Sequence, residues 1–553
     1  MVPARQNRWW ILAAGAFTVL WFAMLFGRPL YDPDEGRYAE IPREMLAGGD
    51  WIIPHLNGFI YLEKPPLQYW MTALSFACCG ETEGSARLYT GLCGYLTLLL
   101  VFLMGRRVWG FEAGIKALLL TVGSILFVLL GHQLTLDMAL CFYLVCSLAG
   151  FVYAQTPRHE SRPEPRPEPR AGGAAMLGCW AAMALAVLTK GLIGVLIPGF
   201  TLLVYVLWQR DTAVLRRLNL RWGIPLFLAL AVPWFVLAAG RNAQFLQFFF
   251  IREHFQRFLT PIEQRSEPWW FFAPVLIVAV LPWLSRAAQA LVGGWRAAAP
   301  RGQFDPRRVF WIWSVFVLVF FSLSDAKLIP YILPAIPTLA LLCAAPRAAG
   351  RFDHLLAGAV LSFAFALGTA AYASAIWSSA SGRALAVELR PALLGTSTAL
   401  GLGALTTAIL ARRGRRLAAL ACLCSAWFAA AVTITLGAIS VEQFFSAKDI
   451  AAALAGVAPK TPIYTVQTYA QSLPFYLGRD VTLVDYRDEF AFGQGQNSGS
   501  SLAGIEAFSR QWLELTDGFA IMPVGTRDRL TAARLPLREL ARFPNRIVLV
   551  SRR

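Results

Sequence analysis

The chain has 553 residues, of which 57% are hydrophobic and only 15% charged, and its net charge is +17 at pH 7. A soluble globular protein is about 45–50% apolar and about 25% charged. An apolar excess of this size cannot be buried in a soluble core. The composition therefore excludes a cytosolic enzyme, a disordered protein, a coiled coil and a nucleic-acid-binding protein. It indicates a chain embedded in a lipid bilayer.

Thirteen apolar segments are candidate membrane helices, since a spanning helix needs roughly 20 predominantly apolar residues. We therefore expect a membrane all-α protein with about 13 transmembrane helices. The first segment follows two arginines and has no small-residue cleavage site, so we expect an anchor rather than a removed signal peptide. The segments are 9–27, 86–104, 112–131, 134–154, 174–189, 191–208, 222–239, 269–288, 309–324, 332–345, 353–377, 391–411 and 417–439.

Arginines are concentrated in every second loop between these segments, for example Arg106 with Arg107 and Arg412 with Arg413. Short loops rich in Lys and Arg stay on the cytoplasmic side of a membrane. We therefore expect these loops and the N-terminus in the cytoplasm. With 13 spans, residues 441–553 then lie on the outer side, which in a bacterium is the periplasm.

The sequence pattern changes after residue 440, where short strand-like segments alternate with helical ones. Such alternation predicts a small α/β domain over 441–553, beside a transmembrane domain over 1–440. The nine cysteines include no CxxC pair, so we expect neither a disulfide framework nor a zinc site. The predicted strands are PIYTV (462–466), VTLVDY (481–486), FAIMPV (519–524) and RIVLVSR (546–552), the predicted helices are 446–456, 505–515 and 527–534, and the predicted solvated segments are the linker 157–173 and the loop 493–501.

The first outer loop, residues 28–85, is rich in acidic and aromatic side chains. Its DPDE motif places Asp32, Asp34 and Glu35 directly after the first predicted span. Ionisable groups close to the membrane interior are costly and usually functional. The alternative is that these acids form a solvated hydrophilic cap.

A helical pattern follows the DPDE acids in EGRYAEIPREMLAGGD (35–50). Proline removes a backbone donor and clashes with the preceding turn. We therefore expect an amphipathic helix that is broken at Pro42, with Ile41, Met45 and Leu46 facing lipid or protein.

Other ionisable residues lie in the remaining outer loops, on the same predicted side of the membrane. Carboxylates and several cations at a boundary between water and lipid suit the binding of a lipid-linked phosphate or pyrophosphate. A purely structural role stays open as the alternative for each group. In these alternatives Asp137 only caps a helix, Lys190 only extends to the interface, Arg252, His254 and Arg257 only contact lipid headgroups, and Asp325 only pairs with Lys327.

The first-loop sequence DPDEGRYAEIPREMLAGGDWIIPHLNGFIYLEKPPLQYW resembles that of the ArnT-like aminoarabinose transferases. LTLDMAL, VLTKGLIG, SDAKLIPYILPAIP and SLPFYLGRDVTLVDYRDEF are similar to later stretches of the same family. The resemblance covers essentially the whole chain. It implies the GT-C membrane fold, which the family shares with the protein O-mannosyltransferases, and a C-terminal periplasmic α/β domain.

The resemblance also implies an activity. A 4-amino-4-deoxy-L-arabinose unit is transferred from undecaprenyl phosphate to a phosphate of lipid A at the periplasmic face of the bacterial inner membrane. The added ammonium group offsets a phosphate charge and so reduces binding of cationic peptides such as polymyxin. The expected partners are the lipid-linked donor, lipid A and membrane lipids, with no nucleic acid, and we expect a monomer.

Site residues follow from the resemblance by position in the matching motifs. The family pattern implies catalytic roles for Asp34 and Asp137. We expect no required cofactor and no metal site, although Glu63 with His254 offers two ligands for an adventitious divalent ion. The implied substrate-binding residues are Tyr38, Tyr61, Glu63, Lys64, Lys190, Arg252, His254, Lys327 and Tyr331.

Two other functions stay open at this point. Another polyprenyl-phosphate-dependent GT-C glycosyltransferase, acting on protein or on a different glycolipid, would show the same spans and first-loop acid. A transporter or flippase would show internal repeats with broken spans at matching positions. The chain contains no such repeat, which disfavours transport.

Overall fold

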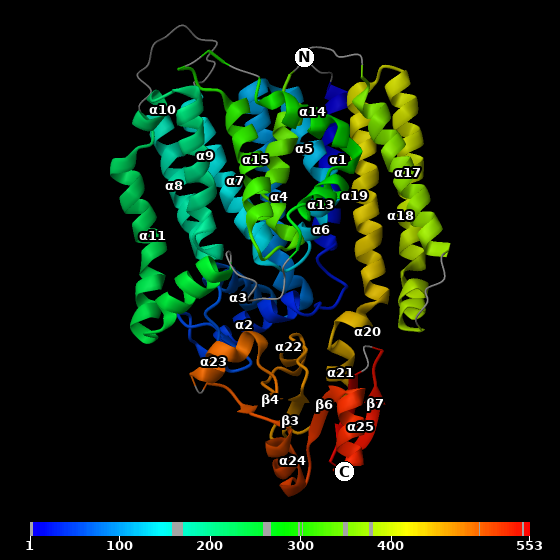
Figure 1. The fold of residues 1–553 in the computed structure, drawn as a ribbon. Helices are drawn as coiled ribbons and strands as arrows, with labels where there is room; N and C mark the ends of the chain where they lie inside the picture. The colour runs from blue at the N-terminus through cyan, green and yellow to red at the C-terminus, as the bar shows by residue number, and fades with distance from the viewer. Residues whose placement is uncertain are drawn as a thin grey trace. The chain divides into compact units, whose positions relative to one another are not determined.

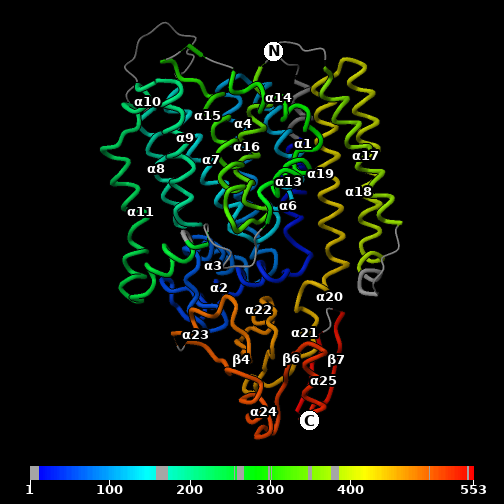
Figure 2. Tube along the Cα trace, in the orientation of Figure 1, coloured from blue at the N-terminus to red at the C-terminus, as the bar shows by residue number. Residues whose placement is uncertain are grey.

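A computed structural model of the chain describes residues 4–156, 170–257, 267–296, 299–300, 302–346, 352–374, 380–496, 498–544 and 547–552. The chain divides into two compact units, whose residues can be located in Figures 1 and 2 from the colour bar, which runs by residue number. The first unit comprises Met1–Tyr89, Ile376–Leu389 and Leu436–Arg553, and the second comprises Thr90–Ala375 and Arg390–Thr435. The first outer loop and the C-terminal residues therefore belong to one unit.

The second unit is built from helices, and each predicted apolar segment of the chain falls on a helix or on neighbouring helices. Within the described residues, eight helices are long and apolar enough to cross a membrane, or up to ten if each bent pair is one span. The bent pairs are α5 with α6, at 72°, and α13 with the helix Leu281–Gly294, at 76°. The expected number of about 13 spans stays a prediction.

The helices that lie in the second unit, or pass between the two units, have the following bounds. They are α4 Glu83–Trp109, α5 Phe111–Val122, α6 Ile125–Gly131, α7 Leu136–Gln155, α8 Arg170–Lys190, α9 Ile193–Gln209, α10 Ala213–Arg216, α11 Leu220–Arg241, η1 Gln247–Gln256, α13 Phe272–Ala279, η2 Leu281–Trp283, α14 Leu284–Gly294, α15 Pro306–Leu323, η3 Ile329–Ile332, α16 Ala335–Ala344, α17 His354–Ser374, α18 Ala380–Arg412 and α19 Arg416–Ser440.

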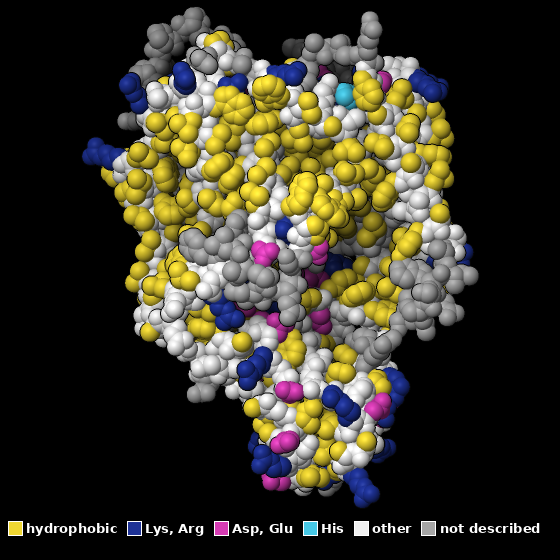
Figure 3. Space-filling model, viewed as in Figure 1, with side chains coloured by type: hydrophobic (Ala, Val, Ile, Leu, Met, Phe, Trp, Pro, Cys, Tyr) yellow, Lys and Arg dark blue, Asp and Glu magenta, His cyan; other side chains and the backbone are white. Residues whose placement is uncertain are grey.

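Small residues allow close packing inside this unit. Helix α7 packs against α8 at Gly150, where an added Cβ would lie 2.6 Å from the Ala175 carbonyl oxygen. Large hydrophobic side chains remain on the outward faces, as Figure 3 shows over the helices, and Leu207 is 69% exposed. An apolar outer surface on long helices is stable only in lipid, so the chain is a multi-span membrane protein.

The expected linker 157–173 lies partly outside the described residues. Its residues 170–173 are not linker but the first turn of α8, which begins at Arg170. The sequence explains this start. Proline is disfavoured inside a helix, and Pro169 is the last proline before the Ala- and Gly-containing run that forms α8.

The first unit begins with α1 (Ala4–Ala23) and the helix α2 (Asp34–Gly48). A short hairpin of β1 (His55–Leu56) and β2 (Phe59–Ile60) follows, and then α3 (Leu67–Cys79). Helix α2 packs against α3 and the hairpin. These elements form the folded core of the long first loop.

The expected break at Pro42 is wrong, because α2 runs without interruption through this residue. Pro42 removes only one backbone hydrogen bond, and the surrounding helix is held by burial on several sides. Ile41 is fully buried and Met45 is 3% exposed, so both face protein. Tertiary packing therefore overrides the local effect of proline.

The C-terminal part of this unit is a six-stranded mixed sheet in the order β5-β4-β3-β6-β8-β7. Strands β5, β4, β3 and β6 are parallel, whereas β8 runs antiparallel to both β6 and β7. All four predicted strands are confirmed. The strands are β3 Ile463–Val466, β4 Thr482–Val484, β5 Ser501–Leu502, β6 Phe519–Pro523, β7 Arg538–Arg542 and β8 Ile547–Ser551.

Short helices connect the strands and cover the sheet. The predicted helices at 446–456, 505–515 and 527–534 correspond to α21, α24 and α25, and Trp512 of α24 is fully buried in the domain core. The expected loop 493–501 begins within α23 and ends in β5. The helices are α20 Glu442–Phe445, α21 Lys448–Ala453, α22 Leu473–Leu477, η4 Asp488–Phe490, α23 Ala491–Gly495, α24 Ile505–Glu514 and α25 Val524–Ala532.

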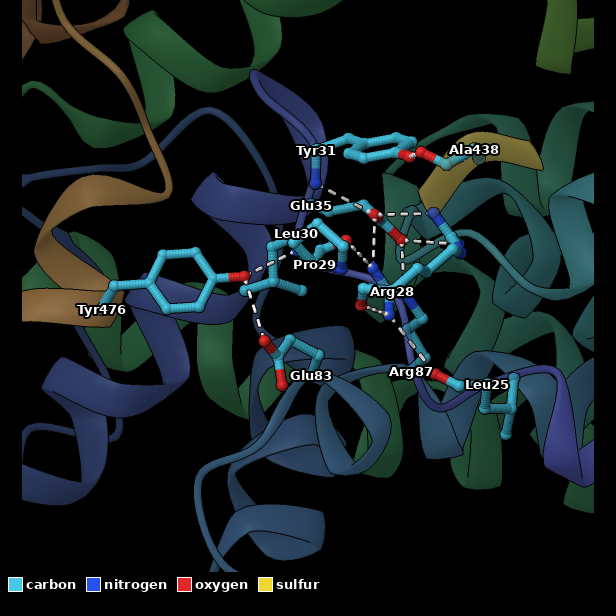
Figure 4. Close-up of polar contacts among 10 residues, drawn as sticks. All are labelled: Leu25, Arg28, Pro29, Leu30, Tyr31, Glu35, Glu83, Arg87, Ala438 and Tyr476. Atoms are coloured by element: carbon cyan, nitrogen blue, oxygen red, sulfur yellow. Dashed lines mark hydrogen bonds and ion pairs between the residues drawn. The ribbon is translucent and has the colours of Figure 1, made fainter. Parts of the chain in front are cut away.

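A buried ion-pair cluster fixes the start of α2 (Figure 4). The Glu35 carboxylate is fully buried and accepts two hydrogen bonds from Arg28, both at 3.1 Å, and two from Arg87, at 2.7 and 2.8 Å. Arg87 also donates to the carbonyl oxygens of Leu25, Arg28 and Pro29. The cluster therefore ties the turn after α1 to the first turns of α2 and α4.

We predict that Glu35→Gln lowers the free energy of unfolding by about 3–5 kcal/mol, because it leaves two buried guanidinium groups without a counter-charge. The matched control is Lys448→Met, which removes a 49% exposed partner of Glu83. An exposed pair contributes at most about 1 kcal/mol. Denaturant unfolding of the purified protein in detergent measures both changes, and equal losses in the two variants would contradict the structural role of Glu35.

Candidate active site

The three acids of the DPDE motif have different surroundings in the structure. Asp32 is partly buried and accepts a hydrogen bond from the Ser472 backbone N–H at 2.6 Å, and desolvation raises its pKa to about 7. Glu35 is bound to Arg28 and Arg87. Asp34, in the first turn of α2, is half-buried and has no hydrogen-bond or ion-pair partner among the described residues. Of the three, Asp34 is therefore the carboxylate available to a substrate.

Close contact with the C-terminal domain fixes the helix that carries Asp34. The loop before α22 lies against the start of α2, and Figure 2 shows the two segments side by side. An added Cβ on Gly36 would lie 2.3 Å from the Ser472 backbone nitrogen, so only glycine fits at this crossing. This contact with the C-terminal domain thus restricts the position of the start of α2.

Three tyrosines and Glu63 gather beside α2. Tyr61 is 2% exposed and donates a hydrogen bond to Glu63 Oε2 at 3.0 Å. The rings of Tyr38 and Tyr69 lie 6.1 Å apart, and the buried Tyr69 hydroxyl has no partner among the described side chains and backbone groups. Burial, reinforced by the charge of Glu63, holds the pKa of Tyr61 well above its usual value. Tyr61 and Tyr69 therefore stay protonated and can donate hydrogen bonds to a sugar or phosphate oxygen.

Arg37 is a member of this group that the sequence did not single out. It is 8% exposed, and its Nε has no hydrogen-bond partner in the described part of the chain. One of its terminal nitrogens lies 3.5 Å from Glu489 Oε1, which also accepts a hydrogen bond from Gln471. Burial disfavours the charged guanidinium, but Tyr61, Glu489, Tyr38 and Glu63 outweigh it and hold its pKa well above its usual value. The sequence did contain a signal for Arg37, because residues three apart on a helix lie on the same face, and Arg37 is three residues after Asp34.

Lys64 follows Glu63 at the end of the same loop. Its ammonium group donates a hydrogen bond to the Glu63 carbonyl oxygen at 3.0 Å, and the side chain is half-buried. The first unit therefore contains five of the expected site residues, namely Asp34, Tyr38, Tyr61, Glu63 and Lys64. They comprise one unpaired carboxylate, two phenols, a second carboxylate and a cation, and Asp34 and Tyr38 share a face of α2 as positions i and i+4.

The other expected site residues belong to the second unit, where three of them meet. Lys190, the last residue of α8, lies 2.5 Å from Asp137 Oδ1 in the first turn of α7. Its ammonium nitrogen also lies 4.7 Å from the centroid of the Tyr331 ring in η3. Asp137 and Lys190 are 14% and 18% exposed. Asp137 therefore does more than cap α7, the alternative that the sequence left open, because its carboxylate forms an ion pair with Lys190.

Two further cations of the second unit have different surroundings. Lys327 is 6% exposed and donates hydrogen bonds to the carbonyl oxygens of Ser324, at 2.5 Å, and Glu267, at 2.8 Å. Arg252 is exposed and lies over the Phe248 ring at 5.5 Å. The side chain of His254 lies outside the described part of the structure. The substrate-binding roles of these residues, and the expected absence of a metal site, stay predictions.

Two family models match the chain. One, described as "Aminoarabinose transferase C-terminal domain", matches residues 447–552, and one described as "Dolichyl-phosphate-mannose-protein mannosyltransferase" matches residues 18–297. The undecaprenyl phosphate-alpha-4-amino-4-deoxy-L-arabinose arabinosyl transferase of Serratia proteamaculans is 33% identical over 62% of this chain and 60% of its own length. The protein of the same name from Pseudomonas aeruginosa strain UCBPP-PA14 is 35% identical over 61% and 59%. The matched region spans about 60% of these curated relatives.

The crystal structure of ArnT from Cupriavidus metallidurans bound to undecaprenyl phosphate matches almost the entire chain. The identity is 32%, the TM-score is 0.88, and the match covers 99% of this chain and 98% of that one. This chain belongs to the ArnT family. The predicted fold class, a helical membrane domain of GT-C type with a C-terminal α/β domain, is therefore confirmed. The archaeal oligosaccharyltransferase AglB from Archaeoglobus fulgidus, at 13% identity and a TM-score of 0.50, shares the fold alone.

We predict that Asp34→Asn in this ArnT-family chain lowers sugar transfer about 10²–10³-fold, the loss seen when one group that stabilises a transition state is removed. The matched control is Asp449→Asn, an exposed aspartate in the first turn of α21. Both substitutions remove a negative charge from a helix N-terminus. A loss of activity in Asp34→Asn alone therefore reports a role of Asp34 in the reaction. Transfer by purified protein measures the effect, and an Asp34→Asn variant with full activity would remove Asp34 from the site.

Proposed function

We propose that the chain transfers 4-amino-4-deoxy-L-arabinose from undecaprenyl phosphate to a phosphate of lipid A. The observation that carries the proposal is the match over 98% of an ArnT chain whose structure holds undecaprenyl phosphate. The arrangement of one unpaired carboxylate, phenols and cations agrees with a lipid-phosphate donor. The multi-span fold agrees with substrates that are themselves membrane lipids.

The reaction exchanges one phosphate ester at the anomeric carbon for another. The bond from C1 to the undecaprenyl phosphate oxygen breaks, and the leaving phosphate keeps the electron pair. A bond forms between C1 and an oxygen of the acceptor phosphate. A phosphate monoester has a second pKa near 6, so at pH 7 it is already largely dianionic and needs no strong base. The transfer needs no redox partner.

Each site residue then has a role that fits its surroundings. Asp34 binds the sugar ammonium or stabilises the positive charge that develops at C1, rather than removing a proton. Lys64 and Arg37 of the first unit offer cations to the departing phosphate. The protonated Tyr61 hydroxyl donates to sugar oxygens when it is not bound to Glu63. Asp137 and Lys190 orient each other as an ion pair. We propose no cofactor and no catalytic metal.

The proposed location is the periplasmic face of the bacterial inner membrane. The alternating arginine-rich loops support this orientation by the positive-inside rule. An added ammonium on lipid A lowers the negative charge of the outer membrane, and so the proposed physiological effect is resistance to polymyxin and other cationic peptides.

A second candidate is transfer of a sugar from a polyprenyl phosphate to protein. The match of residues 18–297 to the mannosyltransferase family model favours it. That matched region contains the first loop but not the C-terminal domain. The aminoarabinose transferase model matches the C-terminal domain instead, which is why lipid A is the preferred acceptor.

Mass spectrometry of lipid A tests the proposed function. We predict that a deletion strain lacks aminoarabinose on lipid A and that wild-type chain restores it, together with growth in polymyxin. The Asp449→Asn control should restore both, whereas Asp34→Asn at equal protein level should restore neither. Unmodified lipid A in the complemented strain, with a new glycan on membrane proteins, would contradict the proposal and favour the protein acceptor.

A further inference from the structure

Three carboxylates lie together on the first unit, apart from Asp34. Glu40 and Glu44 belong to α2, and Asp480 follows α22 in the C-terminal domain. One oxygen from each lies within 4.8 Å of the other two. Glu40 is six residues after Asp34, which places it about 240° further around the helix. The acidic cluster therefore lies on a different face of α2 from Asp34.

The cluster carries more negative charge than its neighbours offset. Arg43 donates to both oxygens of Glu40, at 2.7 and 2.6 Å. Glu44 and Asp480 form no ion pair within 4.0 Å with another described residue, although Arg43 favours the charged form of both and His55 favours that of Asp480. Burial raises the pKa of all three carboxyl groups, and repulsion by the neighbouring carboxylates adds to this for Glu40 and Glu44. A further positive charge would relieve this repulsion.

Each carboxylate keeps capacity for a further ligand. The two Glu44 oxygens accept hydrogen bonds from the backbone N–H groups of Asn57 and Gly58, the latter at 3.0 Å. A carboxylate has about four lone-pair sites. Glu40 and Glu44 therefore keep lone-pair sites for a cation, which would take the place of the hydrogen bond between the two side chains, and the other hydrogen bonds hold both groups in fixed orientations.

A buried hydroxyl points to a ligand at the same place. Tyr469 is 7% exposed, and its hydroxyl has no hydrogen-bond partner among the described residues. Its ring packs edge-on against Phe490 at 4.8 Å, and the charges that act on it most strongly are those of Glu40 and Glu44. A buried hydroxyl without a partner is costly. The hydroxyl therefore lies near enough to Glu40 and Glu44 to feel their charge, and it offers a fourth oxygen to a ligand of the cluster.

We propose that Glu40, Glu44 and Asp480, with the Tyr469 hydroxyl beside them, bind a calcium ion. All of these donors are oxygens, as hard cations require. Ca²⁺ binds oxygen at about 2.3–2.6 Å, so two of its ligands lie at most about 5.2 Å apart, whereas for Mg²⁺ the limit is about 4.2 Å. A separation of up to 4.8 Å therefore fits Ca²⁺ without rearrangement.

The ion joins two parts of the first unit that are far apart in the sequence. It links α2, which carries Asp34 and Tyr38, to the segment between α22 and β4. Asn57 already bridges the same regions, since its side chain donates to the Val481 carbonyl and accepts from the Val481 N–H, both at 2.8 Å. Calcium thus stabilises the docking of the first loop on the C-terminal domain. This inference does not depend on the transferase activity.

Calcium titration of the purified full-length protein tests the site. After treatment with a chelator, we expect Ca²⁺ to raise the thermal unfolding temperature, with a dissociation constant of about 10⁻⁴–10⁻³ M, typical of extracellular sites. Mg²⁺ should act more weakly. Isothermal titration calorimetry with Ca²⁺ alone measures the affinity directly.

Asp480→Asn is the decisive variant, because Asp480 is exposed and its replacement does not disturb the core. We expect at least about a tenfold loss of calcium affinity. Glu44→Gln, which keeps an acceptor oxygen for one of the two backbone N–H groups, should have the same effect. The control Asp517→Asn removes an exposed carboxylate of the same domain and should bind Ca²⁺ like the wild type.

Two results would overturn the proposal. One is a wild-type protein that gains no stability from Ca²⁺, which would leave Glu40 and Glu44 as a pair that shares a proton. The other is an equal calcium response in wild type and Asp480→Asn, which would place the ion elsewhere on the protein or in the detergent. Equal stabilisation by Mg²⁺ and Ca²⁺ would contradict the assignment to calcium.

Discussion

The fold of the first unit depends on the buried contact of Glu35 with Arg28 and Arg87. One carboxylate satisfies two guanidinium groups, and Arg87 closes the turn after α1 by binding three carbonyl oxygens. Breaking a buried ion pair by removing one partner is strongly destabilising, so conformations that separate Glu35 from the two arginines are disfavoured. The ion pairs therefore fix the path of the chain into α2. Asp34 is the residue before Glu35, so its place and orientation follow directly from the ion-pair cluster.

The C-terminal domain is part of the support of the candidate site. It supplies the Ser472 N–H to Asp32, Glu489 to Arg37 and Val481 to Asn57. Gly36 allows the two segments to approach until no side chain fits between them. These contacts give the C-terminal domain a physical task, which is to hold α2 and the hairpin of the first loop in one arrangement.

The sequence predicted those features that depend on apolar patterns. Runs such as IYTV of β3 are buried on both faces, and long apolar segments form helices, so composition alone located them. The acids of the DPDE motif look alike in the sequence, whereas in the structure Asp32, Asp34 and Glu35 have three different environments. Arg87 lies 52 residues from Glu35, and no local pattern relates them. Pro42 misled the prediction because burial of α2 outweighs the lost hydrogen bond.

We propose that the chain moves aminoarabinose between two lipid phosphates. The most direct measurement supplies purified protein with undecaprenyl-phosphate-linked aminoarabinose and offers lipid A and an unmodified membrane protein as competing acceptors. We expect the sugar to appear on lipid A and undecaprenyl phosphate to be released in equal amount. Transfer to the protein acceptor, or no transfer to lipid A while the donor is consumed, would contradict it.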